Sequence, residues 1–168
     1  SYQMKRTRTS KSWMSEHISD SFVKQAQIDG YRSRAAYKLI DINEKYNLFK
    51  KNMVVVDLGS APGSWSQVAI NKIGLKGKLF ALDLLEMEPI KDVDFIQGDF
   101  RNDEVLIEIE NKLNNLKVDL VISDMAPNIS GIKVVDQSAI IHLNELALEF
   151  SCNWLKPNGN LLVKSFIG

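Results

Sequence analysis

The sequence contains few of the residues from which disulfides and metal sites are built. Its 168 residues include one cysteine, Cys152, and two isolated histidines, His17 and His142. A single cysteine excludes an intrachain disulfide and is typical of a reducing compartment. Since no metal-ligand spacing occurs, we expect no metal centre. Cys152 lies in an apolar, helix-like stretch, which predicts a small core residue rather than a nucleophile.

Long apolar runs are also missing. None approaches the roughly 20 residues that a membrane-spanning helix needs, and the first residues do not resemble the apolar core of a signal peptide. We therefore expect a cytoplasmic protein. With 45% hydrophobic and 25% charged residues, the composition is that of a globular protein, and the length predicts a single domain with a sizeable core.

The formal net charge is zero, but the charge is unevenly distributed. Basic residues gather in the first 38 positions, at Lys5, Arg6, Arg8, Lys11, Lys24, Arg32, Arg34 and Lys38. Aromatic residues are interleaved with them, and only three acidic residues oppose them: Glu16, Asp20 and Asp29. Such a segment indicates a polyanionic partner. We expect residues 1–30 to form a basic arm with a short helix, and residues 31–168 to form the folded domain.

Strand-like and helix-like segments alternate after residue 50. We predict strands near 53–57, 78–82, 94–97, 120–123 and 160–165, and helices near 15–27, 34–46, 64–73, 103–113 and 137–155. Ser33 and Asn102 are the expected N-caps of two of these helices. This alternation predicts an α/β fold with a doubly wound, mostly parallel sheet. Because the chain stops just after the last strand, we expect a C-terminal part of the domain to be missing.

The segment from Val54 to Trp65 is the most informative in the sequence. Three β-branched residues predict a buried strand, and Gly59 and Gly63 then bracket a tight turn into a helix. The Gly-x-x-x-Gly spacing differs from the dinucleotide fingerprint Gly-x-Gly-x-x-Gly, and Pro62 lacks an N–H that a phosphate would use. The loop favours a nucleoside cofactor without phosphates, with S-adenosylmethionine as the leading candidate. An ordinary strand–turn–helix of another α/β protein is the competing interpretation.

Charged residues follow the other strands at the same expected edge of the sheet. Asp83 follows the second strand and could accept the ribose hydroxyls of an adenosine. Asp99 follows the third strand and could accept the adenine amino group, with Phe100 against the ring. Asp124 and Lys164 end the fourth and fifth strands. A lysine that ends a buried strand predicts a partly desolvated ammonium, which indicates catalysis more than a snorkelling surface residue.

These motifs resemble those of the FtsJ-type RNA 2′-O-methyltransferases over nearly the whole chain. The matching segments are 32–39 (RSRAAYKL), 57–65, 97–101 (QGDFR), 123–128 (SDMAPN) and 163–164. The resemblance implies a Rossmann-like methyltransferase fold and a catalytic Lys–Asp–Lys–Glu tetrad, three members of which match Lys38, Asp124 and Lys164. The glutamate would lie beyond Gly168. By the same resemblance, S-adenosylmethionine contacts map to Gly59, Gly63, Trp65, Asp83, Asp99 and Asp124.

The resemblance implies transfer of a methyl group to the ribose 2′-hydroxyl of a uridine in 23S rRNA of the large ribosomal subunit, by a monomer. Phosphate contacts would come from Lys5, Arg6, Arg8, Lys11, Arg32 and Arg34. Lys164 would either take the hydroxyl proton or orient the hydroxyl while charged, and the sequence leaves both roles open. Methylation of tRNA or of an mRNA cap is an alternative on the same scaffold. A non-catalytic module that binds S-adenosylmethionine or RNA is another.

Overall fold

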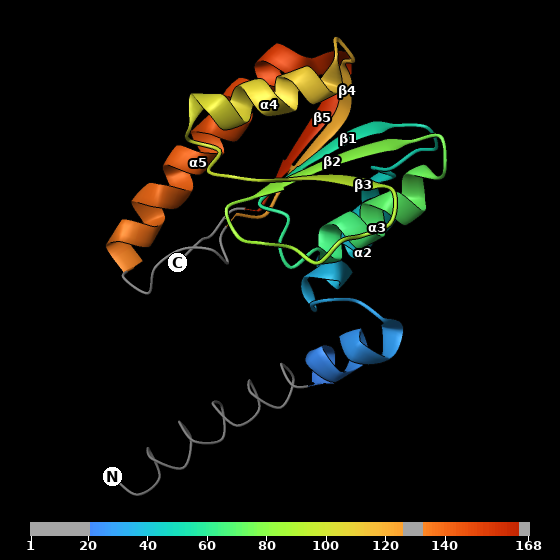
Figure 1. Ribbon diagram of the computed structural model, residues 1–168. Coiled ribbons are helices and arrows are strands. Elements are labelled where there is room, and N and C mark those ends of the chain that lie inside the picture. The colour runs from blue at the N-terminus through green and yellow to red at the C-terminus, as the bar shows by residue number, and fades with distance from the viewer. Residues whose placement is uncertain (1–20, 126–132, 165–168) are drawn as a thin grey trace, which may run out of the picture.

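The computed structural model describes residues 21–125 and 133–164 and contains one five-stranded sheet, drawn in Figure 1. All neighbouring strands are parallel, in the order β3-β2-β1-β4-β5. The strands are β1 (Val54–Leu58), β2 (Lys78–Asp83), β3 (Val93–Gln97), β4 (Val118–Ser123) and β5 (Leu155–Val163). The predicted doubly wound α/β fold is therefore confirmed, with β3 and β5 as the edge strands of the described sheet.

Helices cover both faces of the sheet (Figure 1). They are α2 (Ala35–Tyr46), α3 (Ser64–Ile73), α4 (Asp103–Leu113) and α5 (Lys133–Trp154). Successive side chains of β1 point to opposite faces, as the pleat requires. Val55 packs in the cluster beneath α2 and α3, whereas Val56 packs in the cluster beneath α4 and α5. No helix in the described part of the chain is both long enough and apolar enough to cross a membrane.

Several predicted details differ from the structure. Ser33 does not cap α2, which begins after Arg34 without a side-chain cap; the Ser33 hydroxyl instead lies 2.8 Å from that of Ser64 in α3. Cys152 is exposed rather than in the core, because α5 buries the neighbouring Phe150 and Ser151 instead. β5 begins at Leu155, five residues before its predicted start. The predicted bounds of α3 and α4 are confirmed.

The connection between β2 and β3 has no helix. Parallel neighbours are ordinarily joined by a helical crossover, yet residues 84–92 cross the end of the sheet as irregular backbone. Met87 is the buried anchor of this segment and packs with Ala61 and Ala81. The β2–β3 connection therefore lies against the loop that follows β1.

The direction of winding changes between β1 and β4, since the chain builds outward from β1 to β3 and then returns to add β4 and β5 on the other side. Ligands of open α/β folds bind at such a switch point, outside the carboxyl ends of the strands. Gly59 follows β1 there with φ +78°, and a Cβ on it would lie 2.4 Å from Cγ and 2.9 Å from Cα of Met125, just past β4. The absent side chain allows the two strand ends to meet.

Gly59→Ala should destabilise the protein more than Gly30→Ala. The two glycines have nearly equal φ, +78° and +82°, but nothing lies within 4 Å of a Cβ on Gly30. Both variants should lose about 1 kcal/mol from the left-handed backbone, and Gly59→Ala about 1–3 kcal/mol more from overpacking. Denaturant unfolding measures both. Equal losses would contradict a close approach at Gly59.

Candidate active site

The loop after β1, residues 59–63, is held to the end of β2 by backbone hydrogen bonds. The N–H groups of Gly59 and Ser60 both donate to the Leu82 carbonyl, at 2.8 and 3.1 Å. The Ala61 N–H donates to Oδ2 of Asp83 at 2.7 Å. We call residues 59–63 the β1–α3 loop. Hydrogen bonds to β2 thus fix the conformation of this loop without a ligand.

Asp83 has a structural contact that the sequence did not reveal. Its side chain is buried, and besides Ala61 it accepts the N–H of Leu85 through Oδ1 at 2.8 Å. The carboxylate therefore joins the β1–α3 loop to the start of the β2–β3 connection. A ribose contact at Asp83 would therefore share this carboxylate with the two backbone N–H groups.

Asp57, in β1, is a fully buried carboxylate that lies among other acids. Its Oδ2 accepts the Ser66 hydroxyl of α3 at 2.7 Å. Burial raises the pKa of Asp57 to about 7; the Ser66 hydrogen bond opposes that rise, and the charges of Asp124 and Asp83 add to it. The switch point thus holds three buried acids close enough to influence one another.

Asp124 and Lys164 are brought together at the ends of β4 and β5. The Lys164 Nζ lies 3.7 Å from Oδ2 of Asp124, and its backbone N–H donates to the Ser123 carbonyl at 2.9 Å. Burial raises the pKa of Asp124, and the Lys164 charge partly offsets this. The Lys164 side chain is 41% exposed, so among the described residues its ammonium is partly withdrawn from water.

The other predicted catalytic and RNA-binding residues belong to α2 or precede it in the chain. Lys38 is exposed on α2, and no hydrogen bond or ion pair reaches it from the described residues. Arg34 is exposed one residue before α2. The Arg32 guanidinium, which we expected at a phosphate, donates instead to three backbone carbonyls. The other expected phosphate contacts fall outside the described residues: Lys5, Arg6, Arg8 and Lys11.

Two predicted cofactor residues already have partners within the protein. The Trp65 indole is buried and donates to the Ala35 carbonyl at 2.9 Å, so it joins α3 to α2. A cofactor contact from Trp65 would therefore use its backbone. Asp99 forms a bidentate pair with Arg101, at 2.9 Å from Nε and 2.7 Å from Nη2, which lowers the pKa of Asp99. An adenine amino group would share that carboxylate with Arg101.

The residues at the switch point fit S-adenosylmethionine. Four buried polar atoms have no hydrogen-bond partner among the described residues, and all lie at or near the carboxyl edge of the sheet: Asp57 Oδ1, Ser60 Oγ, Ser123 Oγ and Asp124 Oδ1. Buried polar atoms are ordinarily paired, so their clustering indicates a ligand. The neighbouring carboxylates suit a cation, and S-adenosylmethionine carries a sulfonium and an ammonium. A small cavity lies beside them, lined by Ser33, the β1–α3 loop, Trp65 and Asp124.

Sequence reasoning missed Ser60, Ser66 and Ser123. Serine is common in loops and strand ends, so its identity alone gives no signal; only burial distinguishes these three. Sequence reasoning also missed the hydrogen bonds that attach residues 30–35 to α3. Gln67 accepts the Arg32 N–H and donates to the Gly30 carbonyl, at 2.9 and 3.0 Å.

The fold and the site define a nucleoside-cofactor methyltransferase of the doubly wound class. The family model for FtsJ-like methyltransferases matches residues 31–168, and the chain belongs to that family. A Methylobacillus flagellatus protein named ribosomal RNA large subunit methyltransferase E is 62% identical over 98% of this chain and 80% of its own. A protein of the same name from Nitrosospira multiformis is 61% identical with the same coverage.

A solved structure gives the same result for the fold. A Plasmodium falciparum chain assigned as a ribosomal RNA methyltransferase superposes with a TM-score of 0.71 at 35% sequence identity. The match covers 82% of this chain and 80% of that one. The predicted Rossmann-like methyltransferase fold is thereby confirmed, and S-adenosylmethionine is the methyl donor that this family membership and the carboxylate cluster support.

Asp57→Asn should change how stability depends on pH. Because the folded-state pKa of about 7 lies above the ordinary aspartate pKa of 3.8, the native state holds a proton between about pH 4 and 7 that the unfolded state has lost. Ionisation of Asp57 therefore lowers the free energy of unfolding as pH rises through that window, by at most about 1.4 kcal/mol per pH unit. Asn, which cannot ionise, should remove the decline and stabilise the protein at pH 8.

Denaturant unfolding at pH 5 and pH 8 measures the effect. The matched control is Asp41→Asn, at an exposed position of α2. A decline in stability that persists unchanged in Asp57→Asn would show that Asp57 is not its source.

Proposed function

We propose that this chain transfers a methyl group from S-adenosylmethionine to the ribose 2′-hydroxyl of a uridine in 23S rRNA of the large ribosomal subunit. The observation that carries the proposal is the Asp124–Lys164 ion pair, which lies at the switch point next to the β1–α3 loop. The names of the relatives support the ribosomal substrate, and the motif resemblance supports the 2′-hydroxyl. The protein would act as a cytoplasmic monomer.

The residues that would hold the cofactor lie at the carboxyl ends of β1 to β4 or shortly after them. They are Gly59, Gly63, the backbone of Trp65, Asp83, Asp99 and Asp124. S-adenosylmethionine supplies an electrophilic methyl group when it is bound. The buried acids of the switch point would favour its positive charge through low-dielectric electrostatics. This accounts for carboxylates that would otherwise be costly to bury.

Asp124 and Lys164, with Lys38 as the third catalytic residue, would act on the ribose hydroxyl. The Lys164 ammonium can donate a hydrogen bond to the hydroxyl oxygen and stabilise the negative charge that develops as its proton leaves. Asp124, whose pKa is raised by burial, is a better proton acceptor than an exposed carboxylate. The ion pair therefore supports the orienting role for Lys164, with the proton held at the Asp124 carboxylate.

The basic residues near the N-terminus would bind the RNA backbone. Arg34 is exposed just before α2. Together with Lys5, Arg6, Arg8 and Lys11 it would contact phosphates, which give affinity that falls steeply with salt but little sequence readout. Selection of the target would depend on RNA shape.

A methyl-transfer assay with labelled S-adenosylmethionine tests the substrate. The protein as its gene encodes it is incubated with unmethylated large subunits, free 23S rRNA or tRNA. We expect label in the large subunit, located at a uridine ribose by nuclease digestion. Label in tRNA with none in large subunits would favour the tRNA alternative. Cofactor binding without labelling of any RNA would favour a non-catalytic module.

Lys164→Ala should lower kcat by about 10²–10⁴-fold, the range for loss of a group that acts on the proton and the developing charge. Affinity for S-adenosylmethionine should stay within a few fold, because Lys164 lies on the acceptor side of the site. The matched control is Lys156→Ala, which removes another β5 lysine that pairs with Asp119 outside the site. If Lys164→Ala lost cofactor affinity and turnover equally, the catalytic assignment would be wrong.

A further inference from the structure

We propose that Arg32 is a positioning residue that fixes the β1–α3 loop against the β2–β3 connection and thereby sets the affinity for S-adenosylmethionine. The inference rests on the proposed cofactor and goes beyond the phosphate contact expected of this arginine. It assigns Arg32 to the cofactor side of the reaction rather than to the RNA side.

The Arg32 guanidinium donates hydrogen bonds to backbone carbonyls of both the β1–α3 loop and the β2–β3 connection. Its Nη1 donates to the Pro62 carbonyl at 3.0 Å and to the Glu88 carbonyl at 2.5 Å, and its Nη2 donates to the Pro89 carbonyl at 2.9 Å. Pro62 belongs to the β1–α3 loop, and Glu88 and Pro89 belong to the β2–β3 connection. One planar group thus joins two loops that lie 26 residues apart in the sequence.

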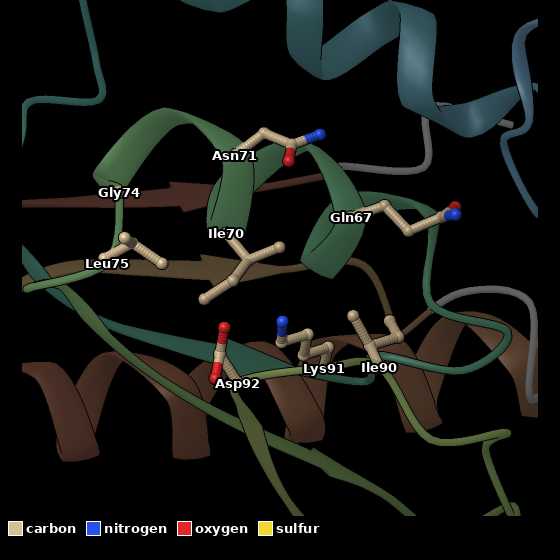
Figure 2. Close-up of a pocket in the computed structure, with 8 residues that line it drawn as sticks. All are labelled: Gln67, Ile70, Asn71, Gly74, Leu75, Ile90, Lys91 and Asp92. Atoms are coloured by element: carbon tan, nitrogen blue, oxygen red, sulfur yellow. The ribbon is translucent and has the colours of Figure 1, made fainter.

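The β2–β3 connection needs such a tie because it lacks a helix. Outside a helix, its carbonyls have no regular partners within the segment. Its far end is also separated from α3 by a cavity of about 480 Å³, lined by Gln67 and Ile70 on the helix and by Ile90 and Asp92 on the connection (Figure 2).

Gly63 makes room for the arginine. A Cβ on Gly63 would lie 3.2 Å from both Cδ and Nη1 of Arg32, and 3.0 Å from Cδ1 of Ile90. Gly63 also has φ +122°, which side chains rarely adopt. The second glycine of the loop thus admits the Arg32 side chain to the carbonyl of the preceding Pro62.

The arginine is also fixed at its own backbone. The Arg32 N–H donates to Oε1 of Gln67, and the Gln67 side chain in turn donates from Nε2 to the Gly30 carbonyl. The backbone that carries the guanidinium is therefore attached to α3 at two points. A preorganised fork loses less conformational entropy for each hydrogen bond that it forms.

Lysine cannot reproduce this arrangement. Its ammonium is a compact point charge, whereas three carbonyls in two segments match the flat, five-donor guanidinium. Arg32→Lys keeps the charge that a phosphate would recognise, but it loses the fork. Arg32→Gln loses both. The two variants therefore separate the positioning role from a phosphate contact.

The experiment measures the Kd for S-adenosylmethionine by calorimetry without RNA, well below each variant's Tm. We expect both Arg32→Lys and Arg32→Gln to raise this Kd by about tenfold. In the methyl-transfer assay, the KM for the cofactor should rise by a larger factor than the factor by which kcat falls. The kcat is measured at saturating cofactor. Lys91→Gln is the control, because it removes an exposed charge from the β2–β3 connection without touching the three carbonyls.

An unchanged cofactor Kd in both variants would overturn the proposal, whether or not their Tm falls. A phosphate contact would give a different pattern, with rRNA affinity lost in Arg32→Gln and largely kept in Arg32→Lys. Since the binding measurement contains no RNA, it stands even if 23S rRNA is not the substrate. Absence of S-adenosylmethionine binding by the unmodified protein would instead overturn the proposed function, and this inference with it.

Discussion

The contact between the turn at Gly59 and the end of β4 is the constraint on which the rest of the site depends. A side chain at Gly59 would overlap Met125, so the two strand ends meet only because the chain has none there. That approach brings the β1–α3 loop beside Asp124, and Asp124 lies beside Lys164 because β4 and β5 are in register. The cofactor side and the acceptor side of the reaction are therefore parts of one packing arrangement.

The same arrangement concentrates negative charge where water is excluded. Asp57, Asp83 and Asp124 are all buried, and several oxygens around them have no partner in the described structure. A protein designed only for stability would not gather acids in this way, since each buried carboxylate is costly to desolvate and the charges of Asp83 and Asp124 add repulsion at Asp57. The cluster becomes favourable when a cation joins it. The buried carboxylates therefore favour a cofactor that carries a sulfonium.

The fold could be predicted from the sequence because its signals are local. β-branched runs marked β1 and β4, and helical periodicity gave the exact bounds of α3 and α4. The approach of Asp124 to Lys164 was predictable too, since both end parallel strands. The exposed fraction of Lys164 was not, because it depends on which segments pack around the end of β5. The hydrogen bonds of Arg32 could not be predicted either. Its acceptors are backbone carbonyls, which every residue has, so the sequence does not show which residues accept.

That choice of acceptors bears on how the protein can evolve. A guanidinium that binds main-chain oxygens places no demand on the side chains at Glu88 and Pro89, but it fixes how far the backbone reaches before it turns into β3. The side chains at Glu88 and Pro89 are therefore free to diversify, whereas Met87 must stay apolar and the length of residues 84–92 is constrained. An insertion there would displace the wall of the site, whereas most substitutions would leave it in place.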